Sequence, residues 1–456
     1  MARSRCARGL TLAVLLLAGL GVARPASANP LDAFGFGSRG AAMGSAAAAD
    51  VQDFSANYYN PAGLALARSL EVSLGYFRAD SYLYMNGQNN QVDPVHGLVG
   101  GLVAPGQLFG VPFAFGLGLH LPDQRLSRVR ALPQDQPVWE LYDNRNQRVY
   151  LAANLAVSPF KWLQIGGGLS FMAATAGSVD ITGNVDVLKV ESSEVRNQVS
   201  ADLTAIRYPQ VGARIAVNDR LAFALVYRGQ FRLTLDLDAT LAGDISLGAA
   251  GTPLTTALYT LQTDSVNAFL PQQVVVGSSW SPIDDLKVDL DLTWVNWSAY
   301  VAPVAQVSIN LDIPPPQGGW PASISPPTTP VATAVIPIVM HDRVVPHVGA
   351  EWRAIVRPKY QGFLRAGYEF DQSPIAPQTG QTNYVDRDRH AFSAGVGVRL
   401  VKLTSVLPGD VRVDAHGQLS VLPTSLTLKS DPSDLVGDYT AGGHIWNVGG
   451  TVTVGF

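Results

Sequence analysis

The stretch Leu221-Ala-Phe-Ala-Leu-Val-Tyr-Arg-Gly-Gln-Phe-Arg-Leu-Thr-Leu-Asp-Leu237 decides the fold class. Its odd positions are apolar or glycine throughout, whereas its even positions include Arg228, Arg232 and Asp236. A period of two indicates a β-strand with one apolar and one polar face. Strands of soluble sheets usually have ~5 to 6 residues, whereas a tilted membrane strand needs ~9 to 11. The length of this stretch therefore favours a strand that crosses a membrane.

The same alternation returns along the rest of the chain, from Leu286 to Trp294 and from Val411 to Val421. It predicts about 14 strands, an even number, joined by short and long connections in turn. That arrangement is typical of an all-β fold, a transmembrane antiparallel β-barrel with short periplasmic turns and long external loops. The strands are expected near 69–83, 95–105, 111–121, 145–157, 163–175, 199–217, 220–237, 265–281, 285–299, 341–355, 359–371, 388–403, 408–428 and 440–456.

Aromatic residues stand at both ends of the predicted strands. Trp162 and Trp280 lie beside short turns, whereas Trp294, Trp297 and Tyr300 lie at the opposite end of a strand. Membrane barrels carry aromatic girdles at both interfaces, so we expect these residues to form two girdles. The alternative is that they are ordinary core aromatics.

The N-terminus has the pattern of a secretory signal. Residues 1–28 hold several arginines but no acid, then an apolar run and the triplet Ala26-Ser27-Ala28. This pattern predicts cleavage before Asn29. Cys6, the single cysteine, lies in this segment, so the mature chain is expected to hold neither a disulfide nor a thiolate metal site.

Charge and motifs argue against several classes of function. Of 32 basic residues, four belong to the signal, and the remaining 28 face 36 acids, which does not favour a nucleic acid as partner. The string from Gly35 to Gly40 matches a dinucleotide motif but follows no strand. Asp386-Arg387-Asp388 offers too few oxygens for calcium, and the histidines lack zinc-site spacing. His416 near Asp414 is a weak basis for catalysis, so no metal, cofactor or enzymatic activity is predicted.

Residues 34–66 are rich in glycine and alanine, lack strand alternation and contain Asn60-Pro61-Ala62 just before the first strand. This segment resembles the N-terminal plug of the FadL/TodX-like (OMPP1) transporters for long-chain fatty acids and aromatic hydrocarbons, whose plug carries an Asn-Pro-Ala signature. Further matches, in the order of that family, are Leu270-Pro271, Gly277, Trp280, Trp294 to Ser298, Arg365 to Tyr368, Asp371, Ser373 to Ile375, Asp386 and Arg389.

The resemblance implies three parts and a location in the Gram-negative outer membrane. Residues 1–28 are the expected signal peptide, 29–68 a plug inside the lumen, and 69–456 the barrel, with a long proline-rich external loop at 300–340. The implied function is ligand-gated passage of hydrophobic small molecules, with Asn60, Pro61 and Ala62 as the gating residues of the plug. A general diffusion porin and a structural or adhesive outer-membrane barrel stay open as alternatives.

Four arginines are candidates for holding the carboxylate of a fatty acid, since a buried charge needs a partner of opposite charge. They lie on predicted lumen faces, where most arginines pair with neighbouring acids. The candidates are Arg228, Arg232, Arg365 and Arg412.

Two further expectations concern exit and assembly. In the family, the ligand leaves sideways beside a kink in the third strand, which here is Val111 to Leu121. Gly116 and Gly118 either weaken the pairing of that strand or only relieve crowding. The last strand ends in Phe456 and resembles the signal that the barrel-assembly machinery recognises; the other expected partners are outer-membrane lipid and lipopolysaccharide. The sequence leaves open the identity of the ligand, its route of exit and the oligomeric state.

Overall fold

The computed structural model describes residues 30–124, 137–143, 149–186, 194–246, 253–300, 306–319, 338–380, 384–402, 409–434 and 436–456. Side chains of strand residues 173–206, 231–254, 256–268 and 306–311 also lie outside the description. The predicted signal segment, residues 1–28, is outside it entirely. In the described chain, no helix is both long and apolar enough to span a membrane.

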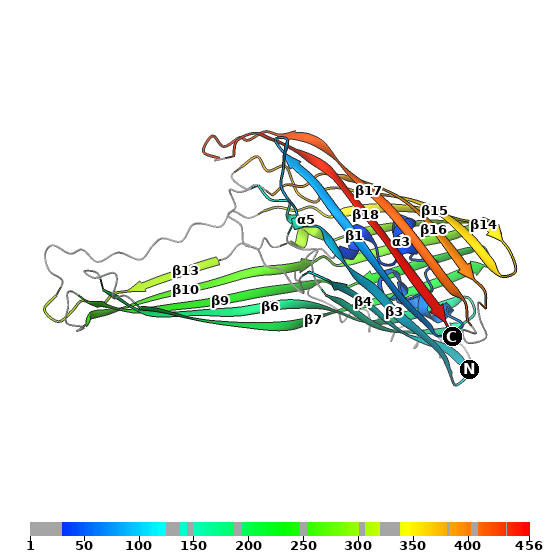
Figure 1. Ribbon diagram of the computed structural model, residues 1–456, viewed down its shortest axis with the longest axis horizontal. Coiled ribbons are helices and arrows are strands. Elements are labelled where there is room, and N and C mark those ends of the chain that lie inside the picture. Colours follow the sequence, from blue (N-terminus) through cyan, green and yellow to red (C-terminus); the bar gives the residue numbers. More distant parts are fainter. Residues whose placement is uncertain are drawn as a thin grey trace, which may run out of the picture.

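The strands form one antiparallel sheet that closes on itself, because β1 (Glu71–Met85) pairs with β18 (Tyr439–Gly455) along its whole length (Figure 1). The predicted all-β barrel of 14 strands is confirmed. A short strand, β2 (Gln88–Asn89), adds to the end of β1. Around the ring β1 is followed by β3 (Val95–Leu108), β4 (Val111–Pro122), β5 (Tyr150–Phe160), β6 (Leu163–Asp186), β7 (Glu194–Asn218), β8 (Leu221–Arg228), β11 (Gln273–Ile283), β12 (Leu286–Val295), β14 (Arg343–Val356), β15 (Tyr360–Asp371), β16 (Arg389–Leu400), β17 (Val411–Thr427) and β18.

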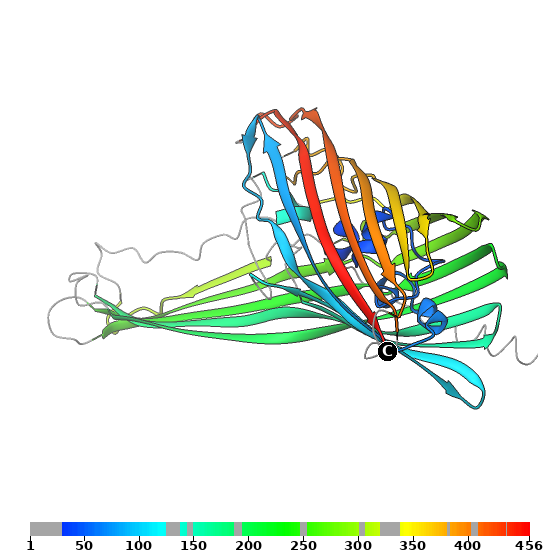
Figure 2. The same cartoon turned by 45° about the vertical axis from the view of Figure 1, so that its right-hand side comes forward.

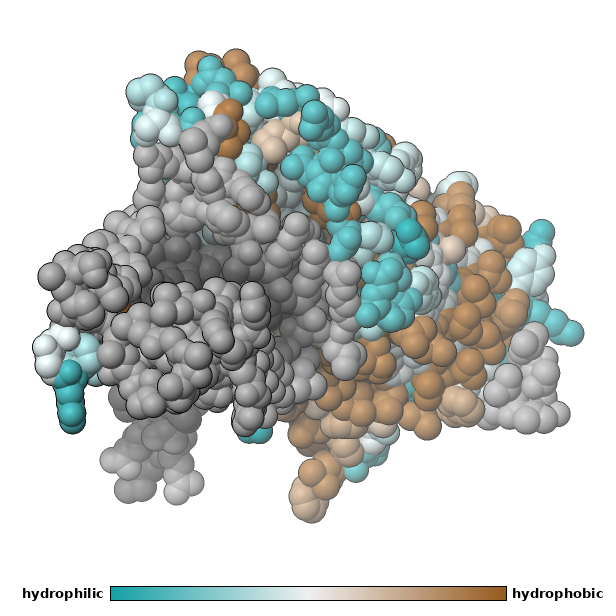
Figure 3. Space-filling view, turned by 60° about the vertical axis from the view of Figure 1, so that its left-hand side comes forward, coloured by the Kyte–Doolittle hydropathy of each residue, from teal (hydrophilic) through white to brown (hydrophobic). Residues whose placement is uncertain are grey.

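The two faces of the wall follow the alternation in the sequence. Leu290 and Leu292 of β12 are 51% and 53% exposed on the outside, whereas Asp289 and Asp291 are buried in the lumen. The outside of the barrel carries a broad hydrophobic area bordered by hydrophilic residues (Figure 3). Exposure of so much apolar surface to water would be unfavourable, so this face is suited to contact with lipid.

We call the end of the barrel with the short turns and the C-terminus the inner end, and the opposite one the outer end (Figure 1). Trp162 and Trp280 are exposed on the wall at the inner end, as expected for a girdle. Trp297 and Tyr300 are buried, so their assignment to the outer girdle is wrong. The chain leaves β12 for a short helix, η3 (Trp297–Ala299), and this turn ends the alternation and directs both rings inward.

Strands continue beyond the outer end, where long loops were predicted (Figures 1 and 2). After a break at Gly229, β9 (Phe231–Ser246) continues β8, and β10 (Pro253–Leu270) leads back into β11. The first part of β6 pairs with β5, whereas its last part, beyond the outer end of the ring, pairs with β9 on the same edge. The short strand β13 (Gln306–Asp312) pairs with β10. The expected loops at 238–264 and 300–340 are therefore wrong in part, because their backbones extend the ladder of hydrogen bonds.

The lumen contains the N-terminal segment, residues 30–68, which appears in blue inside the ring (Figure 2). It consists of α2 (Pro30–Phe34), α3 (Ser38–Ala42), α4 (Ala56–Tyr59) and the 3-10 helix η1 (Pro61–Leu66). Leu31, Phe36, Asn57 and Leu64 are completely buried. The core of the molecule thus lies between this segment and the wall.

Candidate functional site

Asn60 joins the N-terminal segment to the barrel wall. Its side-chain oxygen accepts a hydrogen bond from the Ala62 N–H at 3.0 Å and so caps η1, whose first residue is Pro61. Its amide nitrogen donates to the Ala48 carbonyl at 2.7 Å and to the Ala213 carbonyl of β7 at 3.3 Å. The three residues of the predicted signature therefore form one turn that is bonded both to the segment and to the wall.

Wall glycines make room for this turn. A Cβ atom on Gly212 would overlap the side chain of Asn60, and one on Gly166 would overlap the backbone of Pro61. Any larger residue at these positions would push the turn away from β6 and β7. The spacing of the two glycines in the sequence does not reveal this fit, because the turn that they face is about 100 residues or more away in the chain.

A second junction is formed by Asn57, which sequence reasoning missed. Its carbonyl oxygen accepts hydrogen bonds from Gln210, Asn154 and Tyr150, and its side-chain oxygen accepts another from Asn154 at 2.9 Å. Gln210 and Asn154 are both buried. The sequence does indicate that Asn154 of β5 and Gln210 of β7 are polar residues that face the lumen. It does not indicate that both bind Asn57.

The predicted exit strand, β4, is paired without a register shift to β3 and β5. A Cβ on Gly116 would lie 2.6 Å from the Asn57 side-chain oxygen, and one on Gly118 would lie 2.9 Å from the Asn57 Cβ. The two glycines thus lie where the N-terminal segment approaches the wall closely, and lateral exit beside them stays a prediction.

Charged pairs hold the inner half of the segment. Arg39 of α3 bonds Glu351 of β14 at 2.9 Å and also pairs with Asp50, which in turn accepts a bond from Lys287 at 2.6 Å. Arg365 lies 2.6 Å from Glu351 and 2.8 Å from Asp414. We call this set the inner ion-pair cluster: Arg39, Asp50, Lys287, Glu351, Arg365 and Asp414.

The other arginine candidates have different partners, although Arg412 lies two residues before Asp414 on the same strand, β17. Arg412 pairs with Asp53 of the N-terminal segment at 3.5 Å. Arg228 is buried under the outer half of the segment, where it donates to the carbonyls of Tyr58 and Tyr59 and lies 4.5 Å from the centre of the Tyr58 ring. The side chain of Arg232 is outside the described part of the chain.

Two cavities lie on opposite sides of the N-terminal segment. The one at the inner end has a volume of about 660 Å³ and is largely charged. The outer one has only about 40 Å³, room for a few water molecules. The two cavities share no lining residue. The outer cavity is lined by Leu31, Asp32, Ser45, Ala48, Tyr58, Tyr59, Arg228, Gln273, Val275, Asp291, Thr293, Val295, Arg343, Val345, His347, Glu369 and Asp371.

An outer ion-pair cluster, defined as Arg343, Glu369, Asp371 and Arg389, borders this cavity. Arg389 pairs with Glu369 and lies 3.3 Å from Asp371, and it also donates to the Ala33 carbonyl of the segment at 3.1 Å. Arg343 lies 2.8 Å from Asp371. Asp371 and Arg389 belong to the block that matched the family pattern, whereas nothing in the sequence singled out Arg343 or Glu369.

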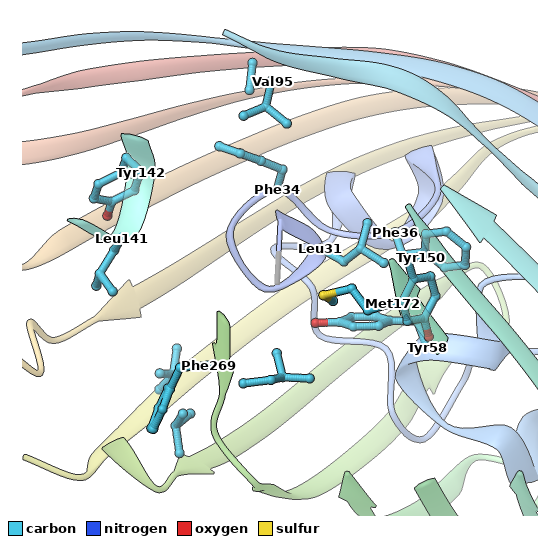
Figure 4. Close-up of a cluster of buried hydrophobic side chains, with 14 of the residues drawn as sticks. Leu31, Phe34, Phe36, Tyr58, Val95, Leu141, Tyr142, Tyr150, Met172 and Phe269 are labelled. Atoms are coloured by element: carbon cyan, nitrogen blue, oxygen red, sulfur yellow. The ribbon is translucent and has the colours of Figure 1, made fainter. Parts of the chain in front are cut away.

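Apolar side chains cover the outer side of the segment. Figure 4 shows Leu31 and Phe34 opposite Leu141, Tyr142 and Phe269. Leu141 and Tyr142 belong to the short helix α5 (Glu140–Asp143). We call this set the apolar cover; it consists of Trp139, Leu141, Tyr142, Phe269, Trp297 and Tyr300, all of them buried.

Contacts within the apolar cover are aromatic. The Phe269 ring lies 5.6 Å from the ring of Trp297 and 4.7 Å from that of Tyr300. Arg343 lies 5.3 Å from the centre of the Trp297 ring, which connects the apolar cover to the outer ion-pair cluster. Among the described residues, no group of three His, Asp or Glu side chains could hold a metal ion.

Several solved structures share this architecture. A Pseudomonas aeruginosa FadL homologue aligns with a TM-score of 0.55 and 15% identity, over 92% of this chain and 98% of its own. The CymD monoaromatic hydrocarbon channel has a TM-score of 0.52 and 15% identity, over 92% and 97%. A mutant of the TodX monoaromatic hydrocarbon channel has 0.51 and 14%, over 93% and 100%. At these identities the likeness shows the fold; no curated protein sequence matches the chain.

Residues 147–409 match the family described as outer membrane protein transport protein (OMPP1/FadL/TodX). The match begins just before β5 and ends just before β17, so it covers more than half of the chain. It includes the whole outer ion-pair cluster and, of the inner one, Lys287, Glu351 and Arg365. The chain therefore belongs to the OMPP1/FadL/TodX family of outer-membrane β-barrels, which transport hydrophobic compounds.

Proposed function

We propose that residues 29–68 act as the plug of this transporter and that a hydrophobic ligand passes only when the plug shifts. One observation carries the proposal: the N-terminal segment separates the two cavities, and the outer one has only about 40 Å³. A fatty acid or an aromatic hydrocarbon is far larger than a few water molecules, so it cannot cross the lumen while the segment stays in place.

In this mechanism the ligand first enters the apolar cover from outside. Apolar surface gains roughly 25 cal/mol per Å² when it leaves water, which is enough to bind a long chain with few polar contacts. Asn60, Pro61 and Ala62 hold the turn about which the segment moves. The path needs no chemical step, and we propose no enzymatic activity.

Other parts of the chain receive roles in the same proposal. Residues 1–28 direct secretion and are removed. The lipid-facing wall contacts outer-membrane lipid and lipopolysaccharide, and Phe456, which is 52% exposed at the end of β18, is recognised by the barrel-assembly machinery.

A reversible crosslink tests the plug directly. Ser38 of α3 and Thr451 of β18 have their hydroxyl oxygens 3.0 Å apart, so S38C and T451C together can form a disulfide that ties the segment to the wall. The oxidised double variant should lose uptake of a radiolabelled hydrophobic compound in cells, and a reductant should restore it. Cys6 lies in the predicted signal, so no other thiol interferes.

A matched pair gives the control. Ser73 and Thr453 have hydroxyl oxygens 2.8 Å apart, but both belong to the wall strands β1 and β18. A disulfide between S73C and T453C should leave uptake unchanged. If both oxidised variants take up the compound as well as the unmodified protein does, the segment is not a moving plug.

A further inference from the structure

We infer that the outer cavity selects uncharged hydrophobic molecules that carry a hydrogen-bond donor, such as long-chain or aromatic alcohols, over carboxylates. This inference concerns the polar end of the ligand and rests on the proposed function, which concerns its apolar body. It follows from the charges around the outer cavity and from the polar atoms there that lack partners.

Acids outnumber cationic side chains in the lining of the outer cavity. Four carboxylates face it, whereas only Arg228 and Arg343 supply permanent positive charge. His347 also lines the cavity, and its ring contacts the Gly44 carbonyl and the Thr293 hydroxyl. A ligand carboxylate would therefore enter a site of the same charge. The four lining acids are Asp32, Asp291, Glu369 and Asp371.

The arginines around the outer cavity are already engaged. Arg389 is bonded to Glu369 and Asp371, and Arg343 is bonded to Asp371. Arg228 donates to two carbonyls of the N-terminal segment and to the side chain of Gln273. At Arg343 Nη1 or at Arg389 a ligand carboxylate would have to displace a protein carboxylate and leave that buried acid without its cation, which is unfavourable. At Arg228 it would have to displace a carbonyl or the Gln273 side chain.

Acceptor atoms, in contrast, are available. The Glu369 Oε2 and Asp291 Oδ1 atoms have no hydrogen-bond partner among the described residues, and both side chains are at least nine-tenths buried. The nearest ring nitrogen to Glu369 Oε2, that of His347, is 3.8 Å away, which is too long for a hydrogen bond. A ligand hydroxyl can donate to such an oxygen, whereas a carboxylate cannot.

One donor atom is available as well. Arg343 Nε has no hydrogen-bond partner in the described structure. A hydroxyl group both donates and accepts, so it is suited to an acceptor such as Glu369 Oε2 and also to this N–H. Only the hydroxyl end of the ligand fits the cavity, whose volume is about 40 Å³. Its body would extend past Leu31, Val295 and Val345 into the apolar core to which these residues belong.

Three compounds with the same chain length separate charge from donor capacity: 1-decanol, decanoate and methyl decanoate. We expect the purified full-length protein in detergent at pH 8 to bind 1-decanol about tenfold more tightly than either of the others by calorimetry. Decanoate binding as tightly as 1-decanol, or methyl decanoate doing so, would overturn the inference. Binding of none of the three would instead contradict the proposed function itself.

Substitution of Glu369 tests the role of the cavity. E369Q removes one lining charge and one of the two acids that pair with Arg389, so decanoate should gain about tenfold in affinity while 1-decanol loses its advantage. D371N should act in the same direction and serves if E369Q does not assemble, which gel mobility before and after heating would show. E71Q is the matched control, because Glu71 also has an unpartnered buried oxygen but lines the inner cavity. An unchanged ratio of the two affinities in both E369Q and D371N would refute the assignment.

Discussion

Amide side chains, together with the ion pairs of the lumen, make the contacts that hold the N-terminal segment in place. Asn60 bonds three backbone groups, one of them on β7, and Asn57 accepts bonds from β5 and β7. Amides suit this task because they can both donate and accept without carrying a charge into the buried lumen. Individual residues therefore decide how firmly the segment is held.

Substitution of Asn60 should loosen the segment without removing it. N60A loses the cap of η1, worth about 1 kcal/mol, and the bonds to Ala48 and Ala213. We expect a small rise of ion conductance in planar bilayers, since the bulk of the segment still fills the lumen. N218A, at the last residue of β7 at the inner end, should conduct like the unsubstituted protein. A conductance of N60A equal to that of N218A would contradict a gating role for Asn60.

A second prediction at this scale concerns pH. Asp386 lies in the outer connection between β15 and β16, where burial raises the pKa of its carboxyl to about 7, although the Ser373 hydroxyl donates to it at 2.7 Å. Unfolded, this carboxyl has a pKa of about 4. Between these values the folded state binds the extra proton, so the stability of the connection should fall as pH rises from about 4 to 7.

Amide hydrogen exchange in residues 372–388 measures this effect. After correction for intrinsic rates, protection should be lower at pH 8 than at pH 5. D386N stays uncharged and should show the same protection at both values. The same pH dependence in both proteins would show that Asp386 is not the titrating group.

At the scale of elements, each strand separates two environments. In β12 the outward residues are apolar and the inward acids contact the N-terminal segment; Asp291, for example, accepts bonds from the backbone N–H groups of Ala47 and Ala48. Asp289 is only 1% exposed, so even the polar face of this strand is packed rather than open to water. Both faces of a wall strand are therefore constrained, one by lipid and one by the segment.

An arginine on the lipid-facing side should be costly. L290R should lower the free energy of unfolding by on the order of 2 to 4 kcal/mol if the position is near the middle of the bilayer. L428R is the control: Leu428 is similarly exposed, at 60%, but follows the end of β17 at the outer end. Urea titrations in lipid vesicles compare the two. An equal loss of stability would mean that the apolar area of the wall does not face lipid.

At the scale of the whole molecule, a closed ring of strands surrounds a segment that divides its lumen. Strands β6, β7, β9, β10 and β13 extend the sheet beyond the outer end, so the molecule is much longer on one side than the ring itself (Figure 1). The ring by itself would be a pore. In the proposed function, the segment turns this pore into a gated transporter.

Removal of the segment should therefore convert the gated transporter into an open pore. Deletion of residues 34–56 should raise ion conductance in planar bilayers strongly, while uptake of hydrophobic compounds loses selectivity or falls. Deletion of residues 313–319, in the outer connection after β13, should leave conductance unchanged. If the intact protein already conducts like an open pore and the first deletion has no effect, the diffusion-porin alternative replaces the proposed function.

The alternation of residues by itself determined the barrel, the number of strands in its ring and the direction of most wall side chains. This was possible because the lipid-facing environment is the same all around the ring, so every strand obeys one local rule. The Asn60-Pro61-Ala62 signature likewise marked the segment that enters the lumen. A local sequence pattern is enough to predict the direction of a side chain wherever its surroundings do not depend on a particular distant residue.

Only the tertiary structure decided which side chains meet in the lumen. Inward position was predictable for Arg365 and Arg228, but their partners, Glu351 and Asp414 for one and backbone carbonyls for the other, depend on how the wall strands and the segment come together. The inward turn of Trp297 and the pairing of β13 with β10 escaped the sequence for a similar reason. Such contacts join residues tens to hundreds of positions apart, and a periodic pattern specifies a face but not a partner.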